Sequence, residues 1–425
     1  MLKNNFKINT KSNIFAYILA LTVYSTEPFK HFVWGSNFAI DIYLISVSIF
    51  GILFLNLNKN FLRIYLIIIL ILLLSFILVI IYNYDLNNFI RQALGVSIVY
   101  LGLGSLILKI DKEKLIKAYM NLALLVAILG LIQWSLSFLE IADVLIKVPG
   151  RLDSITYEPS HYAVTTAPAL FLFIRDYLLK RSMRNLLKMI IIILSFLLTF
   201  SITAYLILFL IIIFLLINYK SFLLISFFSF LLLVTFINTY KLDIKTFKFD
   251  SISNSKAVSG VYKKMLILSD SISQINKIDD MESPKNLTIY SLFINLNAAK
   301  TSLYSGRILG SGFGTHSQII KETVPKKFRN AYYYQNQIFN TNGYSLFIRI
   351  ISEFGLVGIF LYMFFVIKGL SRNILSISIY DTWWLIGSVH MISLILKTTS
   401  FVDNGTPIFL LVPLLINSKI LINEK

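Results

Sequence analysis

The sequence predicts an all-α integral membrane protein, a polytopic bundle of about twelve transmembrane helices with one large, partly helical extracytoplasmic loop. The first observation is composition: 57% of the 425 residues are hydrophobic and only 14% are charged, with a mean hydropathy of +0.76. Soluble domains carry about 25% charged residues. The second is a series of nearly uncharged runs close to the length of about 20 residues that crosses a bilayer. The third is a long polar stretch, 239–341, between two groups of such runs.

The apolar runs divide the chain into three parts. Residues 1–238 hold spans one to nine, residues 239–341 form the outward loop, and residues 342–425 hold spans ten to twelve. No small-residue cleavage site follows the first run, so we expect it to stay as an anchor. The predicted spans are 14–33, 37–55, 61–82, 91–108, 115–139, 161–179, 188–202, 203–218, 221–238, 342–367, 380–399 and 405–422.

The net charge of +18 is explained by the loops between the spans. If the spans alternate in direction, nineteen lysines and arginines of the short loops and termini share the side of the N-terminus. Only four face the other side, namely Lys30, Arg91, Lys147 and Arg151. Basic loops stay cytoplasmic, so we expect a multi-pass protein of the cytoplasmic (inner) membrane with both termini inside. The charge therefore does not indicate a nucleic-acid partner.

The outward loop contains two predicted helices and a glycine-rich turn. Apolar residues recur at three- and four-residue spacing over 258–275, which predicts an amphipathic helix, and a second helical stretch runs from Leu287 to Tyr304. The segment 306–316 then brings glycines at 310, 312 and 314. Glycine allows tight turns and close approach of the backbone to a ligand, although an ordinary loop explains the same residues.

A charged segment, 151–163, lies between two strongly apolar runs. Pro159 suits the first turn of a helix, where its missing N–H is not needed, so the run from His161 to Leu179 should begin there. The positive end of that helix, with Arg151 beside it, is a candidate anion site. The alternative is a polar loop that only caps the helix.

The tenth span carries polar residues well inside it. Ser345, Arg349 and Glu353 are spaced by four and therefore share one helix face. An arginine inside a membrane span is normally directed at a partner, a cavity or a substrate. Two interpretations stay open here: a structural ion pair with Glu353, or contact with a substrate. His390 and Lys397 in the eleventh span raise the same question, although a single histidine is more often packed in a core.

Three motifs occur in a fixed order within this topology: Tyr157–Ala163 (YEPSHYA), Leu309–His316 (LGSGFGTH) and Tyr344–Gly355 (YSLFIRIISEFG). Together with nine spans, a large outward loop and three more spans, they resemble the O-antigen polymerases of the O-antigen ligase/polymerase superfamily. The motifs cover only a small part of the chain. Ligases usually carry His-Asn where this chain has Tyr344 and Ser345. That departure, with Glu158-Pro159-Ser160, favours a polymerase over a ligase.

The resemblance implies a glycosyltransferase that joins undecaprenyl-diphosphate-linked oligosaccharide repeat units into O-antigen, capsule or exopolysaccharide. It implies diphosphate contacts from Arg151 and Arg349, and a role for Glu158 in positioning or deprotonating the acceptor hydroxyl. His161 and His316 are further catalytic candidates. Substrate-binding candidates are Ser160, Arg307, Gly312, Gly314 and Glu353. A chain-length regulator and a flippase are candidate partners. No cofactor is expected, and the four histidines lack metal-ligand spacing.

Other classes also fit a polytopic chain with charges inside its spans. A lipid-oligosaccharide flippase or transporter usually places ionisable residues near the bilayer midplane between repeats, whereas the motifs here cluster where spans meet the outer surface. A membrane scaffold or sensor leaves Arg349 unexplained unless Glu353 pairs with it. A ligase that transfers polysaccharide to lipid A core stays the nearest alternative. There is no cysteine, so no disulfide is expected.

Overall fold

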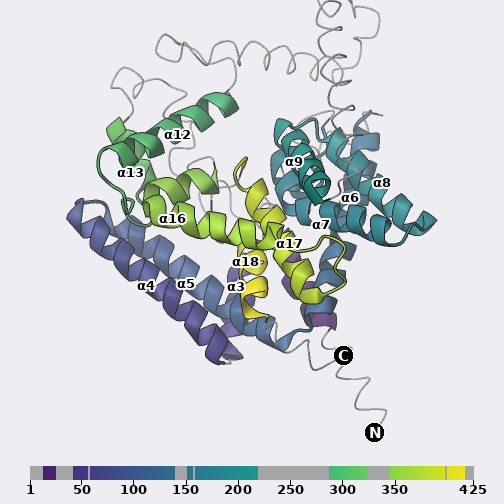
Figure 1. Cartoon of the computed structure of the whole chain (residues 1–425), viewed down its shortest axis with the longest axis horizontal. Helices are drawn as coiled ribbons and strands as arrows, with labels where there is room; N and C mark the ends of the chain where they lie inside the picture. Colours follow the sequence, from purple (N-terminus) through teal and green to yellow (C-terminus); the bar gives the residue numbers. More distant parts are fainter. Residues whose placement is uncertain are drawn as a thin grey trace, which may run out of the picture.

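The computed structural model describes residues 13–24, 42–55, 58–138, 151–156, 158–218, 287–323, 345–397 and 400–416. Throughout these ranges the regular structure is helical (Figure 1), which confirms the all-α class for this part of the chain. A helical segment at 13–21 comes first. The others are α3 (Ile42–Leu53), α4 (Lys59–Ile81), α5 (Leu86–Lys109), α6 (Lys112–Phe138), the short 3-10 helix η1 (Ser154–Thr156), α7 (Pro159–Leu179), α8 (Met183–Leu198), α9 (Ile202–Asn218), α12 (Leu287–Tyr304), α13 (His316–Thr323), α16 (Leu346–Leu370), α17 (Ile379–Ser393) and α18 (Thr406–Leu415).

Each predicted span except 221–238 coincides at least in part with a helix. Four helices are long and apolar enough to cross a membrane, namely α4, α5, α6 and α16. Three more are apolar but shorter: α3, α9 and α18. The count of twelve spans therefore stays a prediction. The predicted helix from Leu287 to Tyr304 is confirmed as α12, whereas the span at 221–238 and the amphipathic helix at 258–275 lie outside the described residues.

The exposed side chains of helix α4 indicate that this helix faces lipid. Its start is capped, because the Asn58 side chain accepts a hydrogen bond from the Phe61 N–H at 2.8 Å. Beyond that cap its large apolar side chains are mostly exposed, Leu70 at 66% and Ile81 at 65% among them. A row of exposed leucines and isoleucines over 23 residues is costly in water and normal against lipid. The helix is accordingly a membrane-facing element.

Helices α3 and α5 pack with their backbones in contact. A Cβ added at Gly102 would lie 2.0 Å from the carbonyl oxygen of Ser48, and one added at Gly51 would lie 2.1 Å from that of Gly102. Small residues at such positions let membrane helices approach closely and gain dispersion contacts where no hydrophobic effect drives association. Gly102, Gly51 and Ser48 therefore determine this helix pair.

We expect Gly102→Leu to separate α3 from α5 and to lower the thermal stability of the detergent-purified protein, because neither backbone can yield to the new side chain. Overpacking of this kind typically costs about 1–3 kcal/mol. The matched control is Gly95→Leu on the same helix, where an added Cβ meets nothing within 4 Å. Equal melting temperatures for the two variants would contradict the close packing.

The helices form two groups joined by α17 and α18 (Figure 1). Helices α3 to α5 and α12, α13 and α16 lie on one side, and α6 to α9 lie on the other. Helix α17 contacts α16 on one side and α7 and α9 on the other, while α18 contacts α17 and α5. Helices α7 and α17 are antiparallel: Arg175 near the end of α7 donates to Thr382 at the start of α17, and Glu158 before α7 pairs with Lys397 after α17. The two ends of this pair therefore carry different charged groups.

Reporter fusions test which end faces outward. Because of the basic loops, we expect fusions after Lys114, Arg181 and Lys425 to score cytoplasmic. Fusions after Lys147, Asp279 and Asn404 should score outward. A cytoplasmic score at Asp279 would reverse the expected orientation and place the Glu158 end on the inner side. Lys147, Asp279 and Lys425 lie outside the described residues, so these fusions also test parts of the chain that the structure leaves open.

Candidate functional site

Glu158 stands at the start of α7, as the sequence predicts. Pro159 is the first residue of the helix, and Glu158 is its N-cap without a side-chain capping bond. Its carboxylate instead accepts a hydrogen bond from the Ser160 hydroxyl at 3.1 Å. It also lies 3.3 Å from His161 Nε2 and 3.3 Å from Lys397 Nζ. We call these four residues, with Asn404, the Glu158 cluster.

Electrostatics keep the Glu158 carboxyl ionised. Burial alone would raise its pKa, but the hydrogen bond from His161 and the positive charge of Lys397 hold that pKa well below its usual range. The Glu158 side chain is still 33% exposed, whereas that of Lys397 is only 8% exposed. The cluster therefore presents a partly accessible carboxylate backed by a buried ammonium group.

Two members of the cluster come from far along the chain. Lys397 follows the last turn of α17, and Asn404 precedes α18 with a left-handed backbone (φ 54°), next to Gly405 (φ 78°). The Asn404 amide lies 3.4–3.5 Å from His161 Nδ1. The sequence indicated Lys397 only as a charge within a span and did not indicate Asn404. The Asn404-Gly405 pair is a common turn signal and could have predicted the turn. Nothing in the sequence indicated that Asn404 contacts His161.

Arg151 lies close enough to Glu158 for the charge of that carboxylate to act on its guanidinium. Its Nε donates to the carbonyl of Thr199 at 3.0 Å, which ties it to the end of α8, and Leu152 N–H donates to Leu198 O at 2.9 Å. The charges of Glu158 and Asp153 both act on the Arg151 guanidinium. The structure thus brings the candidates Arg151, Glu158, Ser160 and His161 together.

A second group of candidates surrounds a break in α16. Gly355 has φ 58° and ψ −142°, so the helix is interrupted there. The interruption would leave helix carbonyls without donors, which is costly in a membrane. The glycine segment supplies them: Ser311 N–H donates to Ser352 O and Gly312 N–H to Glu353 O, each at 3.0 Å. In return Leu356 N–H donates to Ile308 O at 2.9 Å.

Gly310 and Gly312 of this segment therefore approach protein backbone. A Cβ at Gly310 would lie 2.4 Å from Glu353 O, and one at Gly312 would lie 2.7 Å from Ser75 O on α4. Gly314 faces α5, where Asn88 donates to its carbonyl oxygen. The close approach predicted for a ligand is thus made to α16, α4 and α5 in this structure.

We expect Gly310→Ala to destabilise the protein more than Gly306→Ala. Both residues have φ near 85°, at 83° and 88°, so both variants pay the same left-handed strain of about 1–2 kcal/mol. Only Gly310 lies against another backbone, whereas an added Cβ at Gly306 meets nothing within 4 Å. Thermal unfolding of the two purified variants measures the difference, and equal losses would argue against docking of the glycine segment on α16.

Arg349 and Glu353 form a buried ion pair. Arg349 Nη2 lies 2.9 Å from Glu353 Oε1, and the side chains are 4% and 0% exposed. Arg349 Nη2 also donates to Gln92 Oε1 at 2.7 Å, and the guanidinium lies over the ring of Phe401 at 5.1 Å. Glu353 further accepts from the backbone N–H groups of Gly314 and His316. The ion-pair interpretation of the sequence is thus realised, and it connects α16 to α5 and to the glycine segment.

His316 is buried at the start of α13 next to this pair. Its Nδ1 lies 2.7 Å from Ser352 Oγ and its Nε2 2.7 Å from Asn295 Oδ1, so both ring nitrogens are occupied. Burial, with a smaller effect from the Arg349 charge, lowers the pKa of His316 to about 3. The imidazole is therefore neutral at physiological pH and joins α12, α13 and α16.

Arg307 lies at the other end of the glycine segment. It forms an ion pair with Glu322 at 3.0 Å and donates to the Tyr84 hydroxyl. Its guanidinium also lies 5.0 Å from the centre of the Tyr82 ring. These contacts attach the glycine segment to the turn between α4 and α5. Arg307 therefore belongs neither to the Glu158 cluster nor to the buried group around Arg349 and Glu353.

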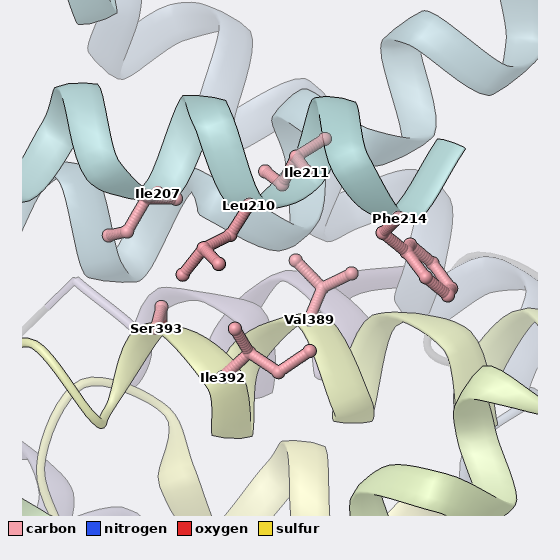
Figure 2. Close-up of a pocket in the computed structure, with 7 residues that line it drawn as sticks. All are labelled: Ile207, Leu210, Ile211, Phe214, Val389, Ile392 and Ser393. Atoms are coloured by element: carbon pink, nitrogen blue, oxygen red, sulfur yellow. The ribbon is translucent and has the colours of Figure 1, made fainter. Parts of the chain in front are cut away.

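The turn between α17 and α18 contacts both the Glu158 cluster and the buried pair of Arg349 and Glu353. Lys397 and Asn404 contact the Glu158 cluster, and Phe401 lies between them in sequence with its ring over Arg349. Helices α9 and α17 face each other across a shallow apolar recess (Figure 2), in which Ile207 lies opposite Ser393. The other lining residues are Leu210, Ile211, Phe214, Val389 and Ile392. Ser393 is four residues before Lys397 in the chain.

No group of three or more histidine, aspartate or glutamate side chains suited to a metal ion occurs among the residues that the structure describes. No protein-family model matches the chain, and no curated protein matches it at a significant level. The chemistry of the site is therefore argued from its own residues.

Proposed function

We propose that this protein is a membrane glycosyltransferase that polymerises undecaprenyl-diphosphate-linked oligosaccharide repeat units at the outer face of the cytoplasmic membrane. The observation that carries the proposal is the Glu158 cluster. A partly exposed carboxylate, an imidazole and the ammonium group of Lys397 meet at the end of a helical membrane bundle, and the guanidinium of Arg151 lies within the electrostatic range of the carboxylate. A carboxylate and an imidazole can orient and deprotonate an acceptor hydroxyl. Cations can bind the diphosphate through charge-assisted hydrogen bonds.

In this reaction the acceptor hydroxyl oxygen attacks the anomeric carbon of the donor chain. A new C–O bond forms, the bond from that carbon to the diphosphate oxygen breaks, and the electron pair leaves with the lipid diphosphate. Arg151 and Lys397 would stabilise the charge that develops on the leaving group. Fixed cations of this kind supply the stabilisation without a metal ion.

The hydroxyl proton needs an acceptor. A carboxyl whose pKa lies far below neutral is a weak base, because general bases work best with a pKa near the working pH. Glu158 is therefore better suited to orienting the hydroxyl and to stabilising a protonated His161 at 3.3 Å. His161 is our candidate for the proton acceptor, and Ser160 holds the carboxylate in place.

The apolar recess between α9 and α17 supports a lipid-linked substrate. Its lining residue Ser393 is four residues before Lys397 in the chain, and in this proposal the first isoprenoid units lie there while the diphosphate meets the cations. Arg349 is paired with Glu353 and its side chain is 4% exposed. We therefore assign Arg349 to positioning the glycine segment, in preference to direct contact with the diphosphate.

The test is a reconstitution of the purified protein in proteoliposomes with undecaprenyl-diphosphate oligosaccharide. Lengthening of the lipid-linked chain supports a polymerase. Transfer only to added lipid A core would support the ligase alternative, and movement of unchanged lipid-linked substrate across the membrane would support a flippase. The departure from His-Asn at residues 344 and 345 is the observation that ranks the ligase second.

A further inference from the structure

The end of the bundle opposite Glu158 carries a separate group of cations. Arg175 lies near the end of α7, Lys368 near the end of α16, and Arg372 follows α16. All three surround the first two turns of α17, where Asp381 and Trp384 lie. We call these five residues the basic end.

Three N–H donors of the basic end have no acceptor among the described residues: Arg175 Nε, Arg372 Nε and Trp384 Nε1. Arg175 and Trp384 are 6% and 1% exposed. Another nitrogen of Arg175, Nη1, donates a hydrogen bond to the Thr382 hydroxyl at 2.8 Å. A buried donor without an acceptor costs about 1–3 kcal/mol, so three of them around one helix start indicate a missing acceptor.

The charge balance of this region also favours an anion. Asp381 lies 3.6 Å from Arg372 and accepts from the Ser376 hydroxyl at 2.6 Å, and the charge of Asp176 acts on Arg175. Three cations thus face two carboxylates. The N-cap of α17, Ser378, makes no side-chain capping bond, which leaves the positive end of the helix dipole as a further contribution.

An apolar surface leads directly to these cations. On α16, Phe360, Phe364 and Ile367 are 73%, 53% and 56% exposed. Lys368 follows them, with its Nζ 5.6 Å from the centre of the Phe364 ring and 4.3 Å from that of Trp384. An amphiphile with its chain along α16 would therefore place its head at Lys368 and Arg372.

We propose that the basic end binds the phosphate headgroup of an anionic phospholipid, whose acyl chains lie along the exposed face of α16. Basic pockets at the ends of membrane helices bind such headgroups, and the loop charges predict that this end faces the cytoplasm. The lipid would join α7, α16 and α17 at the end of the bundle away from Glu158. This inference does not depend on the proposed glycosyl transfer.

The experiment compares lipids added to the purified, delipidated full-length protein. Phosphatidylglycerol is expected to raise the melting temperature and to remain bound in native mass spectrometry, whereas phosphatidylcholine is not. A ligand that binds only the folded state raises the free energy of unfolding with the logarithm of its concentration over Kd. Lys368→Ala with Arg372→Ala should weaken phosphatidylglycerol binding about 25-fold, since each surface cation contributes roughly a fivefold effect.

The matched control is Lys59→Ala with Arg63→Ala, two exposed cations on α4 that share the predicted cytoplasmic side. This control should bind phosphatidylglycerol like the wild type. If the test variant does not fold, Arg372→Gln and the wild-type lipid comparison still decide the question. Equal binding of the two lipids, equal loss in the control, or the same stabilisation by inorganic phosphate alone would each overturn the proposal.

Discussion

Glu158→Gln is expected to abolish polymer formation while the protein still reaches the membrane. The change keeps the size of the side chain and removes the charge that orients the acceptor hydroxyl and would stabilise a protonated His161. Losing such a preorganised electrostatic contact typically costs a factor of about 10²–10³ in rate. Polymer length on gels, normalised to the amount of inserted protein, measures the effect. Arg151→Ala should show a similar loss, because it removes a cation from the leaving group.

A structural role for Glu158 needs a control, because Lys397 is 8% exposed and would be left with a buried charge. Glu158→Gln combined with Lys397→Met removes both charges and should restore stability but not activity. The background control is Glu113→Gln, an exposed carboxylate in an ion pair with Lys117. Full polymer synthesis by Glu158→Gln at normal protein levels would remove Glu158 from the site.

Arg349→Leu and Glu353→Leu are each expected to destabilise the protein by about 3–5 kcal/mol, because each leaves the other charge buried and uncompensated. Glu353→Leu also removes the acceptor for the Gly314 and His316 N–H groups. Thermal unfolding of the purified variants measures both losses. Lys117→Leu breaks a pair with the same i,i+4 spacing, but both of its side chains are more than 60% exposed. That variant should cost less than about 1 kcal/mol.

A double variant without either charge tests whether Arg349 has a structural role or contacts the substrate. Arg349→Met with Glu353→Gln removes both charges and keeps an acceptor oxygen for the glycine segment. We expect this variant to fold and to retain polymer synthesis, since Arg349 is 4% exposed. A stable but inactive double variant would instead assign Arg349 to the diphosphate. Arg349→Lys should then recover little activity, because an ammonium group lacks the planar fork of a guanidinium.

Much of the helical framework could be predicted from local sequence. Apolar runs predict helices over nearly all the described spans, Pro159 predicts the start of α7, and the pattern from Leu287 to Tyr304 predicts α12. The spacing of Arg349 and Glu353 also predicts their pairing, because residues four apart lie side by side on a helix. Lengths are less well predicted: α17 and α18 end several residues before the predicted spans do.

Composition and periodicity by themselves determined the class of this protein, a helical membrane chain, because burial in lipid requires apolar side chains and internally satisfied backbones. Only the tertiary structure decided what the glycines at 310, 312 and 355 approach and which cation meets Glu158. Gly355 breaks α16, and the carbonyls freed there find donors more than forty residues earlier in the chain. Lys397 reaches Glu158 because α7 and α17 run antiparallel. Contacts over such separations depend on how helices pack, and no local pattern encodes them.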